Sequence, residues 1–415
     1  MKKQLRNLAR VMMLTYKRLL YFLCKRALTP KKNIVFFESY QGKKYACNPK
    51  AIYEYMLNDE RFKDYTFVWG FRDVSKYQND TIFTSKSKIG NHQVYLVKYE
   101  SLLYFKYLAK AGYIITNSNP RDFCTFKDSQ VFVQTWHGTP LKKIGLDVNR
   151  TGNAITSLAQ MEKIYNNQAK RIDYMVAPSE FTKEKLISAF NLSEVHKEDC
   201  VLTCGYPRND ILYTHCNNEE YIEKIKEKYN VPKDKKVIMY APTFRDNKHD
   251  VVKGFRANTG FDFNVMKNHF KDYVVLYRSH YFITEKLNLN EYKGFVIDVS
   301  DVDDISDLYL ISDILITDYS SVFFDYANLK RPILFYMYDL EEYKDEVRDF
   351  YFDIEKLPGP IYRTEEEVYK GLVDIENVSE EYQEKYEAFA KEFCDIDDGN
   401  ASKRFVDVVF KNEQA

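Results

Sequence analysis

The chain has 415 residues, of which 45% are hydrophobic, so it is long enough for two or three domains with sizeable cores. Its 61 Lys and Arg residues balance 61 Asp and Glu residues. A chain without net charge has no overall field that attracts nucleic acid or an acidic partner, and we expect no nucleic-acid partner.

The positive charge is concentrated at the amino terminus, where residues 1–37 contain ten Lys or Arg and no Asp or Glu. The apolar runs "VMMLTY" and "LLYFLC" have six residues each, too few to cross a bilayer. The interleaved pattern predicts that residues 1–30 form a basic amphipathic helix on an anionic membrane surface. A helix packed on the protein's own core is the alternative, and a nucleic-acid arm is a weaker third. The apolar positions at helical spacing are Leu5, Leu8, Met12, Leu19 and Phe22.

The cysteines are scattered, odd in number and without a C-x-x-C pair. This pattern predicts reduced thiols in a cytosolic protein and no zinc site. The seven are Cys24, Cys47, Cys124, Cys200, Cys204, Cys216 and Cys394.

Short apolar, β-rich runs alternate with polar helical stretches after the first helix, which predicts an α/β fold with parallel sheets covered on both faces. The charged segment "NNEEYIEKIKEKYNVPKDKK" separates two sets of runs and marks a domain boundary. The first set is "NIVFFES", "TFVWGF", "AGYIITNS", "VFVQTWHG", "DYMVAPS" and "VLTCGYP"; the second is "KVIMYAPTFRD", "YVVLYRSH", "GFVIDVS", "DILITDYSS" and "PILFYM".

This organisation predicts two doubly wound, Rossmann-like domains that face each other across a cleft, which is the GT-B architecture. We expect the amino-terminal domain at residues 31–215 and the carboxyl-terminal domain at residues 232–378. A charged helical tail follows at residues 379–415.

Four polar clusters come directly after apolar runs, so a doubly wound sheet would collect them at its carboxyl edge, facing the cleft. They are His137, the stretch from Thr243 to Asp246, the stretch from Arg278 to His280, and the stretch from Thr317 to Ser321.

His137 lies in "FVQTWHGTPLKKIG", where an apolar run ends in a glycine and a proline that favour a turn. A histidine in this position is a candidate catalytic base, and a turn or capping residue is an equally good interpretation.

The stretch "ITDYSSVFFDY" has a strand end followed by two serines that open a helix. Backbone N–H groups and the hydroxyls of Ser320 and Ser321 would suit a phosphate. Asp325, four residues after Ser321, would share its helix face and reach ribose hydroxyls. A plain N-cap with a solvated aspartate is the alternative.

Two further clusters supply cations. Arg278 and His280 in "YRSHY" suit a pyrophosphate, because one offers bidentate donors and the other a donor or a proton; a cross-strand structural pair is the alternative. Arg245 in "APTFRD" adds a cation after a buried strand, unless it pairs with Asp246.

The acidic stretch "DVDDISD" at residues 301–307 invites a metal assignment, but acids at a helix start are commonly caps and dipole partners. We therefore expect no metal and no cofactor. No P-loop, G-x-G-x-x-G or G-x-S-x-G motif occurs.

Five motifs occur in this order: "QTWHGTPLKKIG", "GYPRND", "YAPTFRD", "YRSHY" and "TDYSSVFFDYANLKRPILFY". Together they resemble the CDP-glycerol glycerophosphotransferase family of teichoic acid synthesis, and the resemblance runs from about Asn33 to Arg363. The resemblance implies a GT-B fold, a CDP-glycerol or CDP-ribitol donor, a lipid-linked acceptor polymer and work at the cytoplasmic face of the cell membrane as a peripheral protein.

The resemblance also implies roles for residues. His137 becomes the general base for the acceptor hydroxyl, and His280 lies near the donor phosphates. The long amino-terminal extension of the large polymerases is missing, which puts processive polymerisation in question. The expected donor-binding residues are Thr243, Arg245, Arg278, Asp318, Ser320, Ser321 and Asp325.

Two other functions compete with the polyol-phosphate transferase. One is a GT-B sugar transferase or nucleotide-sugar epimerase, and the other is an inactive membrane scaffold of a wall-polymer complex. The sequence leaves open glycerol or ribitol, primase or polymerase, teichoic acid or capsule, and the oligomeric state.

Overall fold

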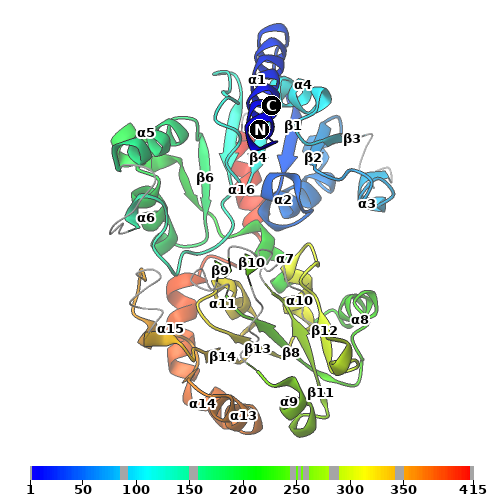
Figure 1. Cartoon of the computed structure of the whole chain (residues 1–415), viewed down its shortest axis with the longest axis vertical. Coiled ribbons are helices and arrows are strands. Elements are labelled where there is room, and N and C mark those ends of the chain that lie inside the picture. Colours follow the sequence, from blue (N-terminus) through cyan, green and yellow to red (C-terminus); the bar gives the residue numbers. More distant parts are fainter. Residues whose placement is uncertain are drawn as a thin grey trace.

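The computed structural model describes residues 2–84, 92–148, 158–243, 249–250, 254–255, 261–279, 289–341 and 350–411. This part of the chain forms two α/β domains, one above the other in Figure 1, with the first helix projecting from the upper one. Each domain is built on a parallel sheet, so the predicted pair of parallel sheets is confirmed.

The sheet of the amino-terminal domain has seven parallel strands in the order β3-β2-β1-β4-β5-β6-β7. Central strand β1 pairs with β2 and β4, and Phe36 lies opposite Val68 on one side and Ile114 on the other. Apolar residues fill both faces because helices cover both. The strands are β1 (Lys31–Glu38), β2 (Thr66–Phe71), β3 (Gln93–Lys98), β4 (Ala111–Thr116), β5 (Val131–Gln134), β6 (Tyr174–Ala177) and β7 (Val201–Thr203).

Two apolar clusters, one on each face of this sheet, form the core of the amino-terminal domain. The helices that contribute to it or surround it are α2 (Cys47–Leu57), α3 (Thr81–Thr84), α4 (Leu102–Lys110), α5 (Leu158–Ala169), α6 (Glu180–Ala189) and α16 (Ala401–Val409).

The carboxyl-terminal domain has a six-stranded parallel sheet in the order β12-β11-β8-β13-β14-β15, and a separate two-stranded antiparallel ribbon. The sheet strands are β8 (Lys236–Ala241), β11 (Tyr273–Tyr277), β12 (Val296–Asp298), β13 (Ile314–Thr317), β14 (Ile333–Tyr336) and β15 (Ile361–Tyr362); the ribbon is β9 (His249–Asp250) and β10 (Gly254–Phe255). The helices are α7 (Asp210–Thr214), α8 (Glu219–Lys228), α9 (Phe263–His269), α10 (Ile305–Ile311), α11 (Val322–Tyr326), α13 (Glu365–Val373), α14 (Ile375–Glu381) and α15 (Gln383–Phe393).

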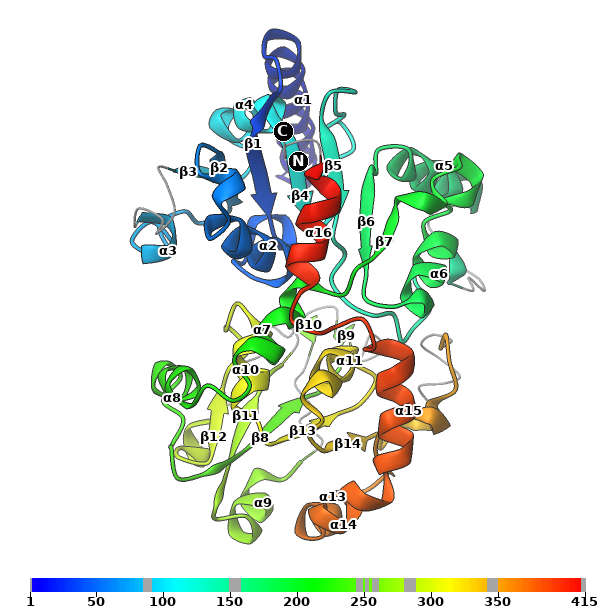
Figure 2. The ribbon, with the colours of Figure 1, turned by 180° about the vertical axis from the view of Figure 1, so that it is seen from behind.

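The end of the chain returns to the amino-terminal domain. Figure 2 shows α15 against the lower domain and α16 against the upper one. Phe405 and Val406 of α16 are fully buried in the upper core. Asp397, in the crossing segment, accepts hydrogen bonds from the Tyr206 backbone N–H at 2.7 Å and from Asn209 Nδ2 at 2.6 Å. These bonds tie the segment between α15 and α16 to the segment after β7, and both segments pass from one domain to the other.

Helix α1 (Lys2–Ala27) lies at the end of the upper domain farthest from the lower one. Only its last turns are anchored: Tyr21 is buried against Phe105 of α4, and its hydroxyl donates to the Thr125 carbonyl at 2.7 Å. None of the helices in the described ranges is both long enough and apolar enough to span a bilayer. The exposed large apolar residues of α1 are Leu5, Leu8, Val11, Met12, Met13, Leu14, Tyr16, Leu19, Phe22 and Leu23.

Candidate active site

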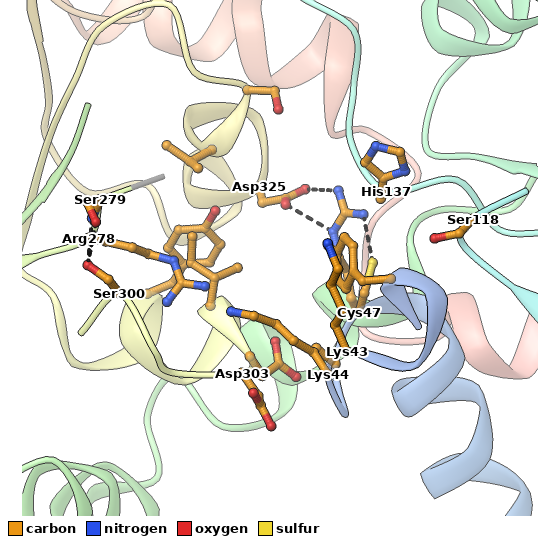
Figure 3. Close-up of a pocket in the computed structure, with 18 of the residues that line it drawn as sticks. Lys43, Lys44, Cys47, Ser118, His137, Arg278, Ser279, Ser300, Asp303 and Asp325 are labelled. Atoms are coloured by element: carbon orange, nitrogen blue, oxygen red, sulfur yellow. Dashed lines mark hydrogen bonds and ion pairs between the residues drawn. The ribbon is translucent and has the colours of Figure 1, made fainter. Parts of the chain in front are cut away.

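A cavity of about 520 Å³ lies between the two domains, at the carboxyl ends of both sheets (Figure 3). A smaller hollow of about 250 Å³ shares His137 and Ser321 with it. The upper wall comes from segments that follow β1, β4, β5 and β7, and the lower wall from segments that follow β11, β12 and β13. Three of the four predicted clusters therefore contribute residues to the cavity itself, and Thr243 of the fourth lines the hollow.

His137 follows β5 by three residues and projects into the cleft. Its Nδ1 lies 3.1 Å from the backbone carbonyl oxygen of Asn117, the residue directly after β4. A carbonyl oxygen only accepts, so Nδ1 carries the hydrogen and donates it. The lone pair is then on Nε2, which is the atom able to take a proton from a substrate.

The pKa of His137 is lowered from 6.5 to about 4. The ring is exposed to the cleft, but protein surrounds it between the domains, and this desolvation is the main cause. The bond to Asn117 opposes the shift, and the positive charge of Arg208 adds to it. The imidazole is therefore neutral at neutral pH, which is the protonation state that a base requires.

Gly138 allows the two walls to approach each other. A Cβ atom at this position would lie 3.1 Å from Ser321 Oγ, across the cleft. A side chain here would press on that hydroxyl, so a glycine after the histidine suits the close contact.

Ser321 precedes α11, a helix of five residues, and makes no side-chain capping hydrogen bond. The plain N-cap considered from the sequence is therefore not what the structure has. The Ser321 side chain lines both the cavity and the hollow, and Ser320 lines the hollow beside His137.

Asp325 also lines the cavity, but its carboxylate is engaged in a buried ion pair. Arg208 Nε donates to Asp325 Oδ2 at 3.0 Å, and Arg208 Nη2 donates to Asp325 Oδ1 at 2.9 Å. Asn209 Nδ2 lies 3.3 Å from the same Oδ1. This fork-like arrangement joins the segment after β7 to α11 and fixes the orientation of the carboxylate.

Arg208 was given no role from the sequence, although it belongs to the quoted "GYPRND" motif. The signal that could have identified it is the one used for the other clusters, because it follows apolar strand β7. Asn117 was also missed, and the same signal could have identified it, because it directly follows β4.

Thr243 and Asp318 form one unit. The Thr243 backbone N–H and hydroxyl donate to Asp318 Oδ1 at 2.8 and 2.6 Å. Asp318 is buried, and Thr243 lines the smaller hollow. The aspartate therefore positions the turn after β8 next to the serines.

Arg278 comes directly after β11, so the strand has ended and the side chain enters the cleft. Its Nη1 donates to the carbonyl oxygens of Val299 at 2.9 Å and Val302 at 3.1 Å. The hydroxyls of Ser279 and Ser300 lie 2.9 Å apart beside it. The cross-strand pair considered from the sequence also involves His280, which is outside the described residues, and this alternative stays open.

The acidic stretch at residues 301–307 contacts cations of the upper domain. Asp303 accepts from Lys76 at 2.7 Å and from the Tyr77 hydroxyl at 2.6 Å, and Asp304 accepts from Lys50 at 2.7 Å. These bonds cross between the domains. In the ranges that the structure covers, no three His, Cys, Asp or Glu side chains gather as a metal site.

Arg245 and His280 lie outside the described residues. Their predicted contributions to the donor site stay predictions.

Positive φ angles cluster on the upper wall. Tyr40, Gln41 and Cys47 line the cavity with φ of 50°, 55° and 66°, and Trp136 lines the hollow with φ of 53°. Bulky side chains rarely adopt this left-handed conformation. Such strain persists where the surrounding structure fixes it, and it is typical of functional sites.

Comparisons with known proteins agree on one group. A family model described as CDP-Glycerol:Poly(glycerophosphate) glycerophosphotransferase matches residues 20–411. The teichoic acid glycerol-phosphate transferase of Staphylococcus aureus is 40% identical over 92% of this chain and 94% of its own length. The teichoic acid poly(glycerol phosphate) polymerase of Staphylococcus epidermidis is 39% identical over 95% of this chain, which spans only 53% of that relative.

Solved structures give the same result. A structure of the wall teichoic acid polymerase TagF superposes with a TM-score of 0.85 at 35% identity, covering 100% of this chain and 97% of that one. The UDP-GlcNAc 2-epimerase of Neisseria meningitidis has a TM-score of 0.50 at 16% identity, covering 91% of this chain and 100% of that one. This second likeness concerns the fold alone.

Proposed function

Because the chain belongs to the CDP-glycerol:poly(glycerophosphate) glycerophosphotransferase family, we propose that it is a polyol-phosphate transferase. It moves glycerol phosphate, or ribitol phosphate, from a CDP-activated donor to a hydroxyl of a lipid-linked teichoic acid or related polymer, and CMP leaves.

The observation that carries this proposal is the placement of His137. Its ring lines a cleft whose opposite wall holds Ser321 and Arg278, and because Nδ1 is engaged by Asn117, the lone pair is on Nε2. The acceptor oxygen attacks the β-phosphorus of the donor, its proton passes to Nε2, and the bond from that phosphorus to the CMP oxygen breaks. Phosphoryl transfer depends mainly on positioning and charge stabilisation, which the lower wall supplies.

The lower wall is proposed as the donor site. Arg278 supplies charge, Ser320 and Ser321 supply donors, and the Thr243–Asp318 unit shapes the turn beside them. Asp325, held by Arg208, lines the cavity and is proposed to contact the ribose hydroxyls of the donor. Arg245 and His280 keep the donor roles that the family resemblance implies.

Glycerol is the first choice of polyol. The glycerol-phosphate enzymes of Staphylococcus aureus and Bacillus spizizenii are both 40% identical over 92% of this chain. The ribitol-phosphate primase of Bacillus spizizenii is 34% identical over 67% of it. The higher identity over more of the chain supports CDP-glycerol.

The direct test is to incubate the protein with CDP-glycerol and CDP-ribitol separately over a matched lipid-linked acceptor. CMP release with CDP-glycerol is expected, and the product length separates one addition from many. EDTA is expected to leave the rate mostly intact. Turnover of UDP-sugars without turnover of either CDP-polyol would support a sugar-nucleotide enzyme, and no CMP release with any pair would support a scaffold.

The donor site has its own test. Calorimetry with CDP is expected to show weaker binding for Arg278→Ala and Ser321→Ala, because both side chains are assigned to the phosphates. Unchanged affinity in both variants would place the donor elsewhere.

Peripheral attachment to the cytoplasmic face of the cell membrane is the second part of the proposal. Leu8 and Met12 on α1 are 58% and 63% exposed, and Leu102 and Leu103 on neighbouring α4 are 56% and 53% exposed. Basic residues are interleaved along α1. Apolar side chains with interleaved cations suit an interface of anionic lipid.

The full-length protein is expected to sediment with vesicles of phosphatidylglycerol and phosphatidylcholine, less with pure phosphatidylcholine, and to be released by salt. The variant with Leu8→Asp and Met12→Asp should lose sedimentation. Val373→Asp is the control, because Val373 is 78% exposed but lies on α13 of the other domain. An equal loss of sedimentation in the α1 variant and in the Val373→Asp control would mean that the attachment is not specific to α1.

A further inference from the structure

Two cations from opposite domains donate to one carbonyl oxygen in the cleft. Lys44 Nζ of the upper wall donates to the Val302 carbonyl oxygen at 3.0 Å, and Arg278 Nη1 of the lower wall donates to the same oxygen at 3.1 Å. In Figure 3 the two side chains extend toward each other across the cavity. A neutral oxygen thus holds two like charges together.

The nearby carboxylates Asp303 and Asp304 form their ion pairs with other cations. Asp303 is engaged by Lys76 and Tyr77, and Asp304 is engaged by Lys50. Within the described parts of the chain, neither Lys44 nor Arg278 forms an ion pair with a carboxylate. Charges that are partly buried without a counter-charge are costly, and a site of this kind is suited to an anion from outside the chain.

The titration of Lys44 agrees with this geometry. Burial, and after it the charge of Arg278, lower its pKa from 10.5 to about 8, while Asp303 and Asp301 act in the opposite direction. Anion binding would reverse the shift, because a negative charge favours the ammonium form. The charged groups that act on Lys44 are Arg278, Asp303, Lys76 and Asp301.

We infer that Lys44 and Arg278 form a two-domain phosphate site, in which a phosphate oxygen of a substrate replaces the Val302 carbonyl as their common acceptor. A charge-assisted hydrogen bond is stronger than the bond to a neutral carbonyl, so the exchange is favourable. The inference deepens the proposed function, which offers two phosphate sources: the diphosphate of the CDP-polyol donor and the phosphodiester of the acceptor.

A purely structural role for Lys44 is the competing explanation. Lys44, like Lys76, reaches from the upper domain to the segment at residues 299–304, and both contacts hold the domains together. The difference is that Lys76 already has a carboxylate partner, Asp303. Lys76→Met is therefore the control, because it breaks a different contact between the upper domain and the same segment and leaves Lys44 and Arg278 in place.

The first measurement is the calorimetric Kd of CDP, without acceptor, for the full-length wild type and three variants. Lys44→Met, which keeps the length of the side chain, is expected to raise the Kd about tenfold, which corresponds to about 1.4 kcal/mol. Lys44→Arg should restore most of the affinity, and Lys76→Met should stay within about twofold of the wild type. Circular dichroism melting curves verify that each variant is folded.

The second measurement is proton uptake on CDP binding at pH 8, obtained from calorimetry in two buffers with different ionisation enthalpies. Near pH 8 about half of free Lys44 is neutral, since its pKa is about 8, so the wild type should take up a fraction of a proton. Lys44→Arg should take up less, because arginine stays charged. A structural contact would not produce this difference.

The outcomes separate the two phosphate sources and the two proposals. If Lys44→Met raises the KM of the lipid-linked acceptor about tenfold and leaves the Kd of CDP unchanged, the site holds the acceptor phosphodiester. If neither changes, or if Lys76→Met causes the same loss, the inference is overturned. If the wild type binds CDP through Lys44 but turns over neither CDP-polyol, the proposed function fails and the phosphate site stands.

Discussion

The upper wall of the cleft holds an imidazole on strained backbone, whereas the lower wall presents hydroxyls and a guanidinium on relaxed backbone. Tyr40, Gln41, Cys47 and Trp136 of the upper wall have positive φ. Among the described residues that line the cavity from the lower wall, none does. Two domains of the same architecture thus build their strand ends differently.

The difference follows from what each wall has to do. A base must present one nitrogen, in one tautomer, to one hydroxyl, and misplacement of the reacting groups costs rate steeply. An anion site needs donors and positive charge, which tolerate small displacements because charge interactions fall off slowly with distance. Strain is therefore expected where orientation matters most.

The largest effect is expected from breaking the link between the walls. Arg208→Met leaves the buried Asp325 carboxylate without its cation, and the free energy of unfolding should fall by about 3–5 kcal/mol, measured in urea. The double variant Arg208→Met with Asp325→Leu should recover most of this loss, because no unpaired charge remains.

Lys224→Met is the control for that experiment. Lys224 pairs with Glu220 on the surface of α8, where both side chains are largely exposed, and its loss should cost about 0.5 kcal/mol or less. If Arg208→Met costs no more than this control, the ion pair does not hold the walls together.

The next effect concerns the upper wall alone. His137→Ala should lower kcat by about 10²-fold or more and leave the Kd of CDP unchanged, because the base acts on the acceptor. His269→Ala, an exposed histidine on α9, is the control and should keep the rate. Near-normal turnover of the His137 variant would reduce this residue to a turn position.

A smaller effect is expected in the pH profile. Because desolvation between the domains lowers the pKa of His137 to about 4, its neutral form persists as the pH falls, and we expect the acid limb near pH 4. A histidine with an ordinary pKa would lose about tenfold in kcat/KM between pH 7.5 and 5.5. We expect kcat/KM to change by less than about twofold over that range. An acid limb near pH 6.5 would mean that His137 is as hydrated as a surface histidine.

The smallest effect tests the strain itself. Gln41 has φ of 55° at the cavity, and Gln41→Gly should raise the free energy of unfolding by about 0.5 kcal/mol, since glycine adopts this conformation without a steric penalty. The same change should lower kcat severalfold by loosening the wall. Asn191→Gly, at φ of 57° on the upper domain but not among the cavity-lining residues, should stabilise similarly without affecting kcat. If Asn191→Gly lowered kcat as much as Gln41→Gly, the strain at the cavity would have no specific role in turnover.

Much of the fold could be predicted because the signal is local. Strands buried on both faces appear as continuous apolar runs, such as "NIVFFES", and all eleven predicted runs contain strands. Edge strand β3 was missed, although Val94 to Val97 form a short apolar run that could have identified it; only Val97 of this strand is buried. The carboxyl ends of the predicted strands also located His137, Arg278 and Ser321.

The sequence by itself therefore determined which residues reach the carboxyl edge of each sheet, because strand direction and apolar periodicity are properties of short segments. Only the tertiary structure decided how those residues meet. Arg208 and Asp325 are 117 residues apart, and Lys44 and Val302 are 258 apart. Their contacts, like the Asn117 carbonyl that sets the tautomer of His137, depend on how separate strands and two domains pack together, and no local pattern encodes that geometry.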